Sequence, residues 1–161
     1  MYLFLKHKPY LQIVLVFSFF FILFHTMYFS VTLLSSSDDH YFHFKFAEVI
    51  RHQGFHEAFL NFKSIYFSPY TTNQYLIQYN FLYYLVLLPF TYIQPLFLAI
   101  KLYAVIVVAF TFTTLYACLR AFKVNNPFVW SVAAVGVMGY SALWRFFLSR
   151  PYSLAPAFLL L

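Results

Sequence analysis

Apolar positions divide the chain into long uncharged runs that short polar segments separate. The first run, 11–34, contains no formally charged residue, and as a helix it would reach about 35 Å at roughly 1.5 Å per residue. That length is enough to cross the roughly 30 Å hydrocarbon layer of a bilayer. We therefore predict a first transmembrane helix over 11–34.

Later runs repeat this pattern. Residues 96–119 form the second predicted span, 128–144 form the third, and a fourth begins at 154. The eight apolar residues of this last run reach only about 12 Å as a helix. We therefore expect residues 1–161 to be the truncated, N-terminal part of a single transmembrane domain that continues beyond Leu161.

The run 81–93 is also apolar, but it is shorter than the spans. Pro89 interrupts it, Gln94-Pro95 closes it, and its thirteen residues would cover only about 20 Å as a helix. We expect an interfacial or re-entrant helix here, within an outer loop over 35–95. If 81–93 crossed the membrane instead, every later segment would change sides.

The outer loop also contains an amphipathic pattern. Apolar side chains recur at helical spacing, at Phe42, Phe46, Val49 and Ile50. The polar residues between them fall on other faces: Lys45, Glu48, Arg51 and His52. We expect a short helix on the membrane surface that ends at Gly54. The predicted fold class is therefore all-α, a polytopic transmembrane helical bundle with amphipathic interfacial helices in the first outer loop.

Composition supports the same class. Hydrophobic residues make up 63% of the chain and charged residues only 9%, which excludes a soluble domain. The formal net charge of +6 comes from Lys and Arg residues that are scattered singly and form no basic stripe. We therefore expect the lipid bilayer as a partner and no nucleic acid.

The cations set the predicted orientation. Lys6 and Lys8 precede the first span, and Arg120 and Lys123 precede the third. Under the positive-inside rule these residues lie in the cytoplasm, so the outer loop lies on the non-cytoplasmic face. A crossing at 81–93 would put Arg120 and Lys123 outside, so the charge bias argues against it. We expect a multi-pass protein of a bacterial inner membrane with a cytoplasmic N-terminus.

All four acidic residues of the chain fall in the outer loop: Asp38, Asp39, Glu48 and Glu57. The adjacent pair comes where the first span leaves the bilayer, which concentrates carboxylate chemistry at one membrane surface. The same pair would suit the first turn of a helix, where one Asp accepts hydrogen bonds from free N–H groups and both are favoured by the helix dipole.

Two short motifs and the order of the segments resemble a known enzyme family. Asp38-Asp39-His40-Tyr41-Phe42 opens the outer loop, and Ser149-Arg150-Pro151-Tyr152 follows the third span. With the amphipathic helix and the proline-broken segment between them, they look like the N-terminal part of the integral-membrane glycosyltransferases of the C-type fold. Protein O-mannosyltransferases and the bacterial transferases that decorate lipid A are similar examples.

This resemblance implies a polyprenyl-phosphate-linked sugar donor and an acidic pair in the first extracytoplasmic loop. The acceptor, whether glycan, lipid or protein, is not specified. The resemblance covers only the front part of such an enzyme, so we expect this part to be inactive alone.

The chemistry of glycosyl transfer suits these residue types. A carboxylate must take the proton from the acceptor hydroxyl, and Asp38 and Asp39 are the catalytic candidates. The leaving polyprenyl phosphate needs compensating cations, for which Arg145, Arg150 and Lys101 are the candidates. Taken alone, Arg150 and Lys101 would also suit the role of anchors that extend from a helix end to the membrane surface.

Histidines add one further pattern. His40 with His43, and His52 with His56, are each spaced to share a helix face, so a divalent metal is the one cofactor left open. The segment from His52 to His56 lacks the acidic residue of a zinc-protease motif, and Gly54 weakens the helix that the spacing requires. We therefore predict solvated interfacial histidines and assign no metal ligand.

Two other functional classes stay open, a membrane transporter subunit and a non-catalytic membrane assembly protein. A transporter would place ionisable residues inside its spans, where Lys101 and His25 are the ambiguous cases. An assembly protein gives no reason for one face to collect all four acids. The predicted function is therefore a membrane glycosyltransferase that acts on the non-cytoplasmic face.

Overall fold

The computed structural model describes residues 9–30, 38–61, 81–138, 143 and 147, and it describes only the backbone of 38–40, 59–61 and 81. Every element in these ranges is a helix, as the all-α prediction requires. The chain forms two compact units: unit 1 comprises Met1–Ser35 and Lys101–Leu161, and unit 2 comprises Ser36–Ile100.

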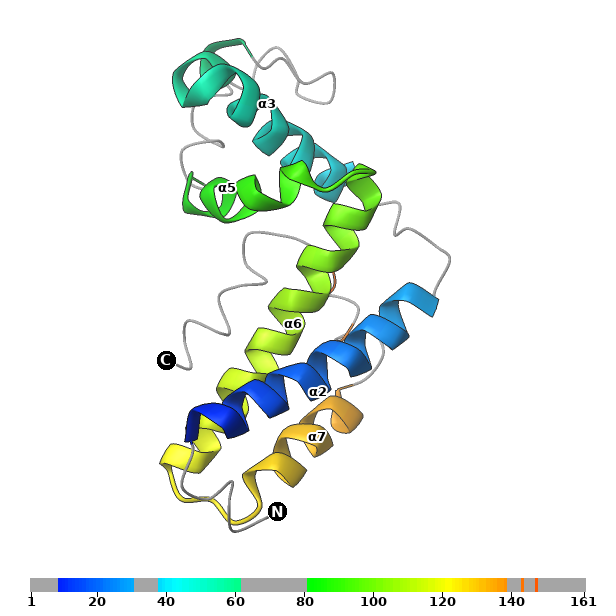
Figure 1. Cartoon of the computed structure of the whole chain (residues 1–161), viewed down its shortest axis with the longest axis vertical. Helices are drawn as coiled ribbons and strands as arrows, with labels where there is room; N and C mark the ends of the chain where they lie inside the picture. The colour runs from blue at the N-terminus through cyan, green and yellow to red at the C-terminus, as the bar shows by residue number, and fades with distance from the viewer. Residues whose placement is uncertain (1–8, 31–37, 62–80, 139–142, 144–146, 148–161) are drawn as a thin grey trace. The chain divides into compact units, whose positions relative to one another are not determined.

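Two long helices contribute to unit 1 (Figure 1). Helix α2 spans Pro9–Ser30, and helix α6 spans Leu96–Ala121, of which the part from Lys101 onward belongs to unit 1. Both helices are long and apolar enough to cross a membrane. The spanning helices predicted over 11–34 and 96–119 are confirmed to that extent, although residues 31–34 lie outside the described part of the chain.

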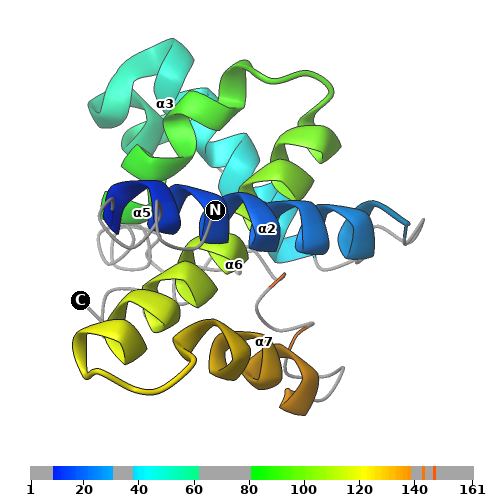
Figure 2. The same ribbon diagram turned by 60° about the horizontal axis from the view of Figure 1, so that its bottom comes forward.

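Helices α2 and α6 pack antiparallel. Near the start of α2, the amide oxygen of Gln12 accepts a hydrogen bond from Arg120 in the last turn of α6. Near the end of α2, the ring of Tyr28 lies beneath the ammonium of Lys101, in the second turn of α6. Figures 1 and 2 show the two helices running in opposite directions.

Aromatic rings fill the interface between these helices. Phe112 of α6 contacts Phe20 and Phe24 of α2, with ring centroids 5.5 and 5.3 Å apart, and all three side chains are buried. Smaller side chains of α6 complete this core: Ala104, Val105, Val108 and Ala109. The large rings and the smaller side chains together fill the interface between the two helices.

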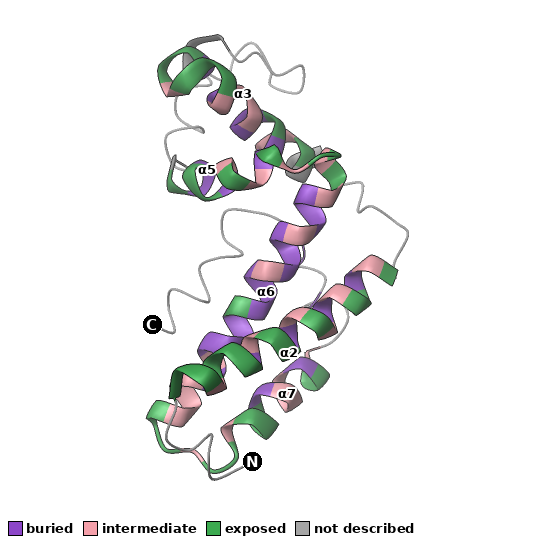
Figure 3. Ribbon diagram, in the orientation of Figure 1, coloured by how far each residue is buried: buried purple, intermediate pink, exposed green. Residues whose placement is uncertain are grey.

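The two helices differ in how many of their side chains are buried (Figure 3). Most side chains of α6 between Lys101 and Phe112 are buried, whereas the buried residues of α2 are Val16, Phe20, Phe24 and Tyr28. The exposed side of α2 is itself apolar, with Leu11, Ile13, Val14, Leu15, Phe19 and Ile22. A helix that is apolar on its exposed side as well as its packed side suits a lipid environment.

Hydroxyl groups in these helices bond to their own backbone. Thr111, Thr113 and Thr114 of α6 each donate a hydrogen bond to the carbonyl four residues earlier, at 2.7–2.9 Å. Thr26 of α2 does the same toward Ile22, at 2.9 Å. These bonds satisfy the hydroxyls without water, as apolar surroundings require.

Helix α7 spans Pro127–Val137 and is shorter than predicted. Met138 is extended, with ψ at 111°, so the helix expected over 128–144 is not continuous. Gly136 in the last turn is a poor helix former and favours this early end. Eleven residues reach only about 16 Å, less than a bilayer needs. The predicted span from 154 onward lies outside the described residues.

Unit 2 contains helices α3 (Asp38–Asn61) and α5 (Phe81–Leu87), the 3-10 helix η1 (Leu88–Tyr92) and the first turn of α6. Helix α3 packs on α5 and η1. Its buried face includes the predicted Phe46 and Ile50, whereas Phe42 and Val49 are half-buried. A helix is confirmed here, but the buried Phe44 and Ala47 were not part of the predicted apolar face, and the position of the helix on a membrane surface stays a prediction.

Gly54, where the helix was predicted to end, instead interrupts α3, because its φ of 79° and ψ of 166° are not helical. This backbone region is essentially restricted to glycine. Helical turns resume afterwards and continue to Asn61, which the sequence pattern did not predict.

The short helix predicted over 81–93 is confirmed as α5 followed by η1. Pro89 lies at the start of η1, where its missing N–H is tolerated. The Gln94-Pro95 peptide bond is cis, and α6 begins directly after it.

Candidate functional site

The predicted site residues differ in what the structure describes of them. Asp38 and Asp39 form the first turn of α3, where only their backbone is described. This position suits a capping role as well as a catalytic one. Arg145 and Arg150 lie outside the described residues. Lys101 is therefore the one predicted site residue whose side chain is described.

Lys101 is buried against aromatic rings of α2. Its side chain is only 8% exposed, and its Nζ lies 5.6 Å from the ring centroid of Tyr28 and 5.2 Å from that of Phe29. The negative faces of aromatic rings attract an ammonium group at such distances. Within unit 1, Lys101 is thus held in a cluster of rings rather than extended into solvent as a surface anchor.

His25 joins the same cluster. Its imidazole stacks on the ring of Phe29, with centroids 4.2 Å apart and planes 15° from parallel. Phe147 stacks on Tyr28 with a centroid distance of 4.6 Å. His25 and Lys101, the two ionisable residues within the predicted spans, therefore both contact the ring of Phe29 near the end of α2. His25 and Lys101 are far apart in the sequence, so the sequence gives no sign that they share a contact.

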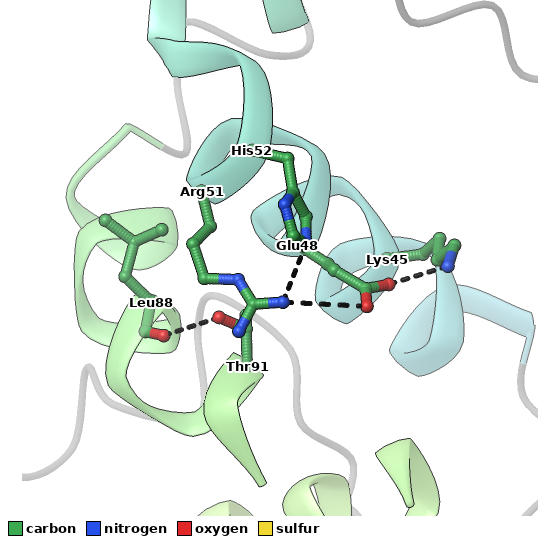
Figure 4. A network of polar contacts seen from close by, with 6 residues as sticks. All are labelled: Lys45, Glu48, Arg51, His52, Leu88 and Thr91. Carbon is green, nitrogen blue, oxygen red and sulfur yellow. Dashed lines mark hydrogen bonds and ion pairs between the residues drawn. The ribbon is translucent and has the colours of Figure 1, made fainter. Parts of the chain in front are cut away.

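A second polar cluster lies on α3 (Figure 4). Lys45 donates to Glu48 at 2.6 Å, and the guanidinium of Arg51 lies 3.9 Å from the other carboxylate oxygen. The hydrogen bond from Lys45 holds the pKa of the Glu48 carboxyl below its ordinary value, and the same bond raises the pKa of Lys45. The carboxylate of Glu48 is therefore paired with cations of its own helix, α3.

Arg51 links this cluster to η1. Its guanidinium carbon lies 4.7 Å from the ring centroid of Tyr92, and its Nη2 lies 2.7 Å from Nε2 of His52. The described contact assigns Nε2 of His52 as the acceptor, because a guanidinium can only donate. The sequence pattern places Arg51 on a polar face and gives no sign of its contact with Tyr92. The cation–π pair links segments about forty residues apart, which no local pattern reveals.

His43 is half-buried and contacts α5, whereas the sequence predicts a solvated side chain. Its Nδ1 lies 3.0 Å from the hydroxyl of Tyr84 on α5, and burial raises the pKa of that tyrosine. His52 contacts Arg51 instead of joining His56. Among the described residues, no group of three or more His, Cys, Asp or Glu side chains is arranged to hold a metal ion.

Comparison of the chain with models of known protein families, with curated proteins and with solved structures found no match.

Proposed function

We propose that this chain belongs to a multi-pass membrane glycosyltransferase that moves a sugar from a polyprenyl-phosphate donor to an acceptor on the non-cytoplasmic face. The supporting observation is the antiparallel packing of α2 and α6. It puts Lys101 beside Tyr28 and Phe29, near the end of α2 from which the chain runs on to Asp38 and Asp39. If both helices cross the membrane, these ionisable residues belong to the same side.

The proposed reaction assigns a task to each residue type. The acceptor hydroxyl oxygen forms a bond to the anomeric carbon of the sugar, and the bond from that carbon to the polyprenyl-phosphate oxygen breaks. Asp38 or Asp39 takes the hydroxyl proton. The phosphate leaves with the bonding electron pair, and its growing negative charge is stabilised by cations, for which Lys101, Arg145 and Arg150 are proposed.

Sugar transfer by variants of the complete polypeptide that contains this sequence tests the acidic pair. We expect Asp38→Asn or Asp39→Asn to lower turnover by about 10²-fold to 10⁴-fold, the usual contribution of a positioned base, while membrane insertion is unchanged. Glu57→Gln is the matched control, because Glu57 is an exposed carboxylate on the same helix. Near-normal turnover of both Asp variants would leave the pair as a helix cap and refute the mechanism.

A second test separates the phosphate role of Lys101 from packing. Met fills similar space without charge, whereas Arg keeps the charge and offers a fork that matches phosphate. We expect Lys101→Met to weaken donor-lipid binding and Lys101→Arg to retain part of it, with similar thermal stability for both proteins. Equal donor binding by Lys101→Met and the parent would exclude the phosphate role.

The contact of His25 and Lys101 with one ring also favours a second candidate, a transport protein. Ionisable residues inside membrane spans commonly mark a path for ions or protons. Reconstitution in vesicles distinguishes this function: His25→Phe and Lys101→Met should then abolish a proton or anion flux that Asp38→Asn leaves intact. A glycosyltransferase shows no such flux.

A further inference from the structure

The turn between α6 and α7 gathers cations and aromatic rings at one end of unit 1. Arg120 lies in the last turn of α6, and Lys123 is exposed in the turn itself. Phe122 is 82% exposed and Trp130, in the first turns of α7, is 58% exposed. Tyr10, which is 83% exposed, lies in the first turn of α2, close in sequence to Gln12, which Arg120 contacts.

The backbone of the turn presents Lys123 outward. Lys123 donates its N–H to Arg120 and Val124 donates to Leu119, at 3.0 and 2.9 Å, the pair of bonds of a Schellman motif. Lys123 occupies the left-handed position of this motif, with φ at 56°, where glycine is the usual residue. The backbone of a lysine is strained in this conformation. The strain therefore falls on the residue that carries the positive charge.

No carboxylate in unit 1 can neutralise these cations. All Asp and Glu residues of the chain lie between Asp38 and Glu57, and that range belongs to unit 2. The contact described for Arg120 is to the neutral amide of Gln12, which brings no negative charge to the guanidinium. The turn is therefore complementary to an anion from outside the unit.

We propose that this turn, with Arg120 and Lys123 as the cations, binds the phosphate groups of anionic phospholipids in the leaflet where α2 begins. Arg120 offers a planar fork to a phosphodiester, and Lys123 adds a point charge. Phe122, Trp130 and Tyr10 are residue types that favour the headgroup layer beside such a site. The inference rests on the membrane embedding that is part of the proposed function, and it is independent of sugar transfer.

Fluorescence of Trp130 provides a local test. The complete protein, with every tryptophan except Trp130 replaced by Phe, is reconstituted in phosphatidylcholine vesicles that contain brominated phosphatidylglycerol or brominated phosphatidylcholine. Bromine quenches a nearby indole, so the two series give the relative affinity for the two lipids. We expect preference for phosphatidylglycerol, and a loss of about fivefold in relative affinity for each of Arg120→Gln and Lys123→Gln.

Three variants control for structure. Lys123→Arg keeps the charge and should keep the preference, whereas Lys123→Gly relieves the backbone strain and should lose it. Lys45→Gln removes an exposed lysine from α3 and should leave the preference unchanged. If Lys123→Gly alone changed lipid preference and Lys123→Gln did not, the turn conformation rather than the charge would be responsible, and the proposal would fail.

The remaining outcomes separate the inference from the proposed function. Equal quenching by both brominated lipids would refute the headgroup site while leaving the membrane embedding intact. Absence of quenching by either lipid would refute both. If inorganic phosphate relieved the quenching and phosphatidylglycerol content had no effect on it, the ligand would be a soluble anion. The assignment to a lipid would then be overturned.

Discussion

The amide oxygen of Gln12 accepts a hydrogen bond from the guanidinium of Arg120, which ties the start of α2 to the end of α6. Tyr116 donates to the same oxygen at 3.3 Å. A membrane crossing at 81–93 would make α2 and α6 run parallel across the bilayer, so that Gln12 and Arg120 would lie on opposite sides. The contact therefore favours a topology in which 81–93 does not cross the membrane, and the side on which each end lies stays a prediction.

Accessibility of single cysteines tests this orientation. In a Cys118→Ser background, we expect Gln53→Cys to react with a membrane-impermeant thiol reagent added from the non-cytoplasmic side. Asn125→Cys, in the α6–α7 turn, should react only after the membrane is permeabilised. Both positions are exposed in the structure, so burial would not explain a difference. Labelling of Asn125→Cys from outside would contradict the predicted orientation.

The Gln12 contact should also contribute to stability. Gln12→Leu leaves Arg120 and Tyr116 without this acceptor, and an unsatisfied polar group of this kind typically costs about 1–3 kcal/mol. We expect thermal unfolding of the detergent-solubilised protein to shift to lower temperature. Gln12→Glu keeps an acceptor and should restore stability, whereas equal destabilisation by both variants would point to loss of packing instead.

Phe112 should contribute more to stability than its neighbour Phe110. Phe112 is 1% exposed and contacts two rings of α2, whereas Phe110 on the same helix is 39% exposed. We expect Phe112→Ala to lower the free energy of unfolding by about 3 kcal/mol through lost contacts and a cavity, and Phe110→Ala to cost much less. Similar losses for both variants would contradict the α2–α6 interface.

The helices that depend on local sequence were the predictable part of this fold. Long uncharged runs predict α2 and α6, because nothing within them favours a break. Pro89 follows the end of α5, and Gly54 marks the break in α3. The end of α7 at Val137 was harder to predict, because a single glycine, Gly136, is the local signal for it. Its sequence remains apolar past that point, so hydrophobicity alone favours a longer helix.

The candidate site was less predictable, because its contacts join distant segments. Lys101 was selected for its charge, but its burial against Tyr28 and Phe29 depends on the packing of α6 on α2. The contact of Arg51 with Tyr92 likewise depends on how α3 packs on η1. No periodic pattern contains this information, since periodicity describes one helix at a time.

The ion pair of Lys45 and Glu48 predicts a dependence of stability on pH. The folded-state pKa of Glu48 lies below its ordinary value of 4.5, so the pair stabilises the protein above that pH and loses its effect as pH falls through the lowered pKa. Because Lys45 is half exposed, Lys45→Gln should cost only about 0.3–0.5 kcal/mol at pH 7. The difference from the parent, measured by unfolding, should disappear in acid; a difference that persists there would exclude the ion pair as its cause.

Gly54 and Gly136 allow a paired test of the break in α3. An added Cβ would meet nothing within 4 Å at either position, so steric contact cannot distinguish them. Gly54 has a φ of 79° and a ψ of 166°, which an alanine adopts only at a cost of about 1–3 kcal/mol. Gly136 lies within helix α7, where replacement by alanine typically gains about 0.5–1 kcal/mol.

We therefore expect Gly54→Ala to destabilise the protein and Gly136→Ala to stabilise it, measured by thermal unfolding in the same detergent. Amide hydrogen exchange locates the effect, because strain at Gly54 should accelerate exchange in α3 on both sides of the break and leave α6 unchanged. Stabilisation by Gly54→Ala would mean that α3 runs through this position as a continuous helix. His52 and His56 would then lie on one face of that helix, and the histidine pair would again be a reasonable candidate for a metal site.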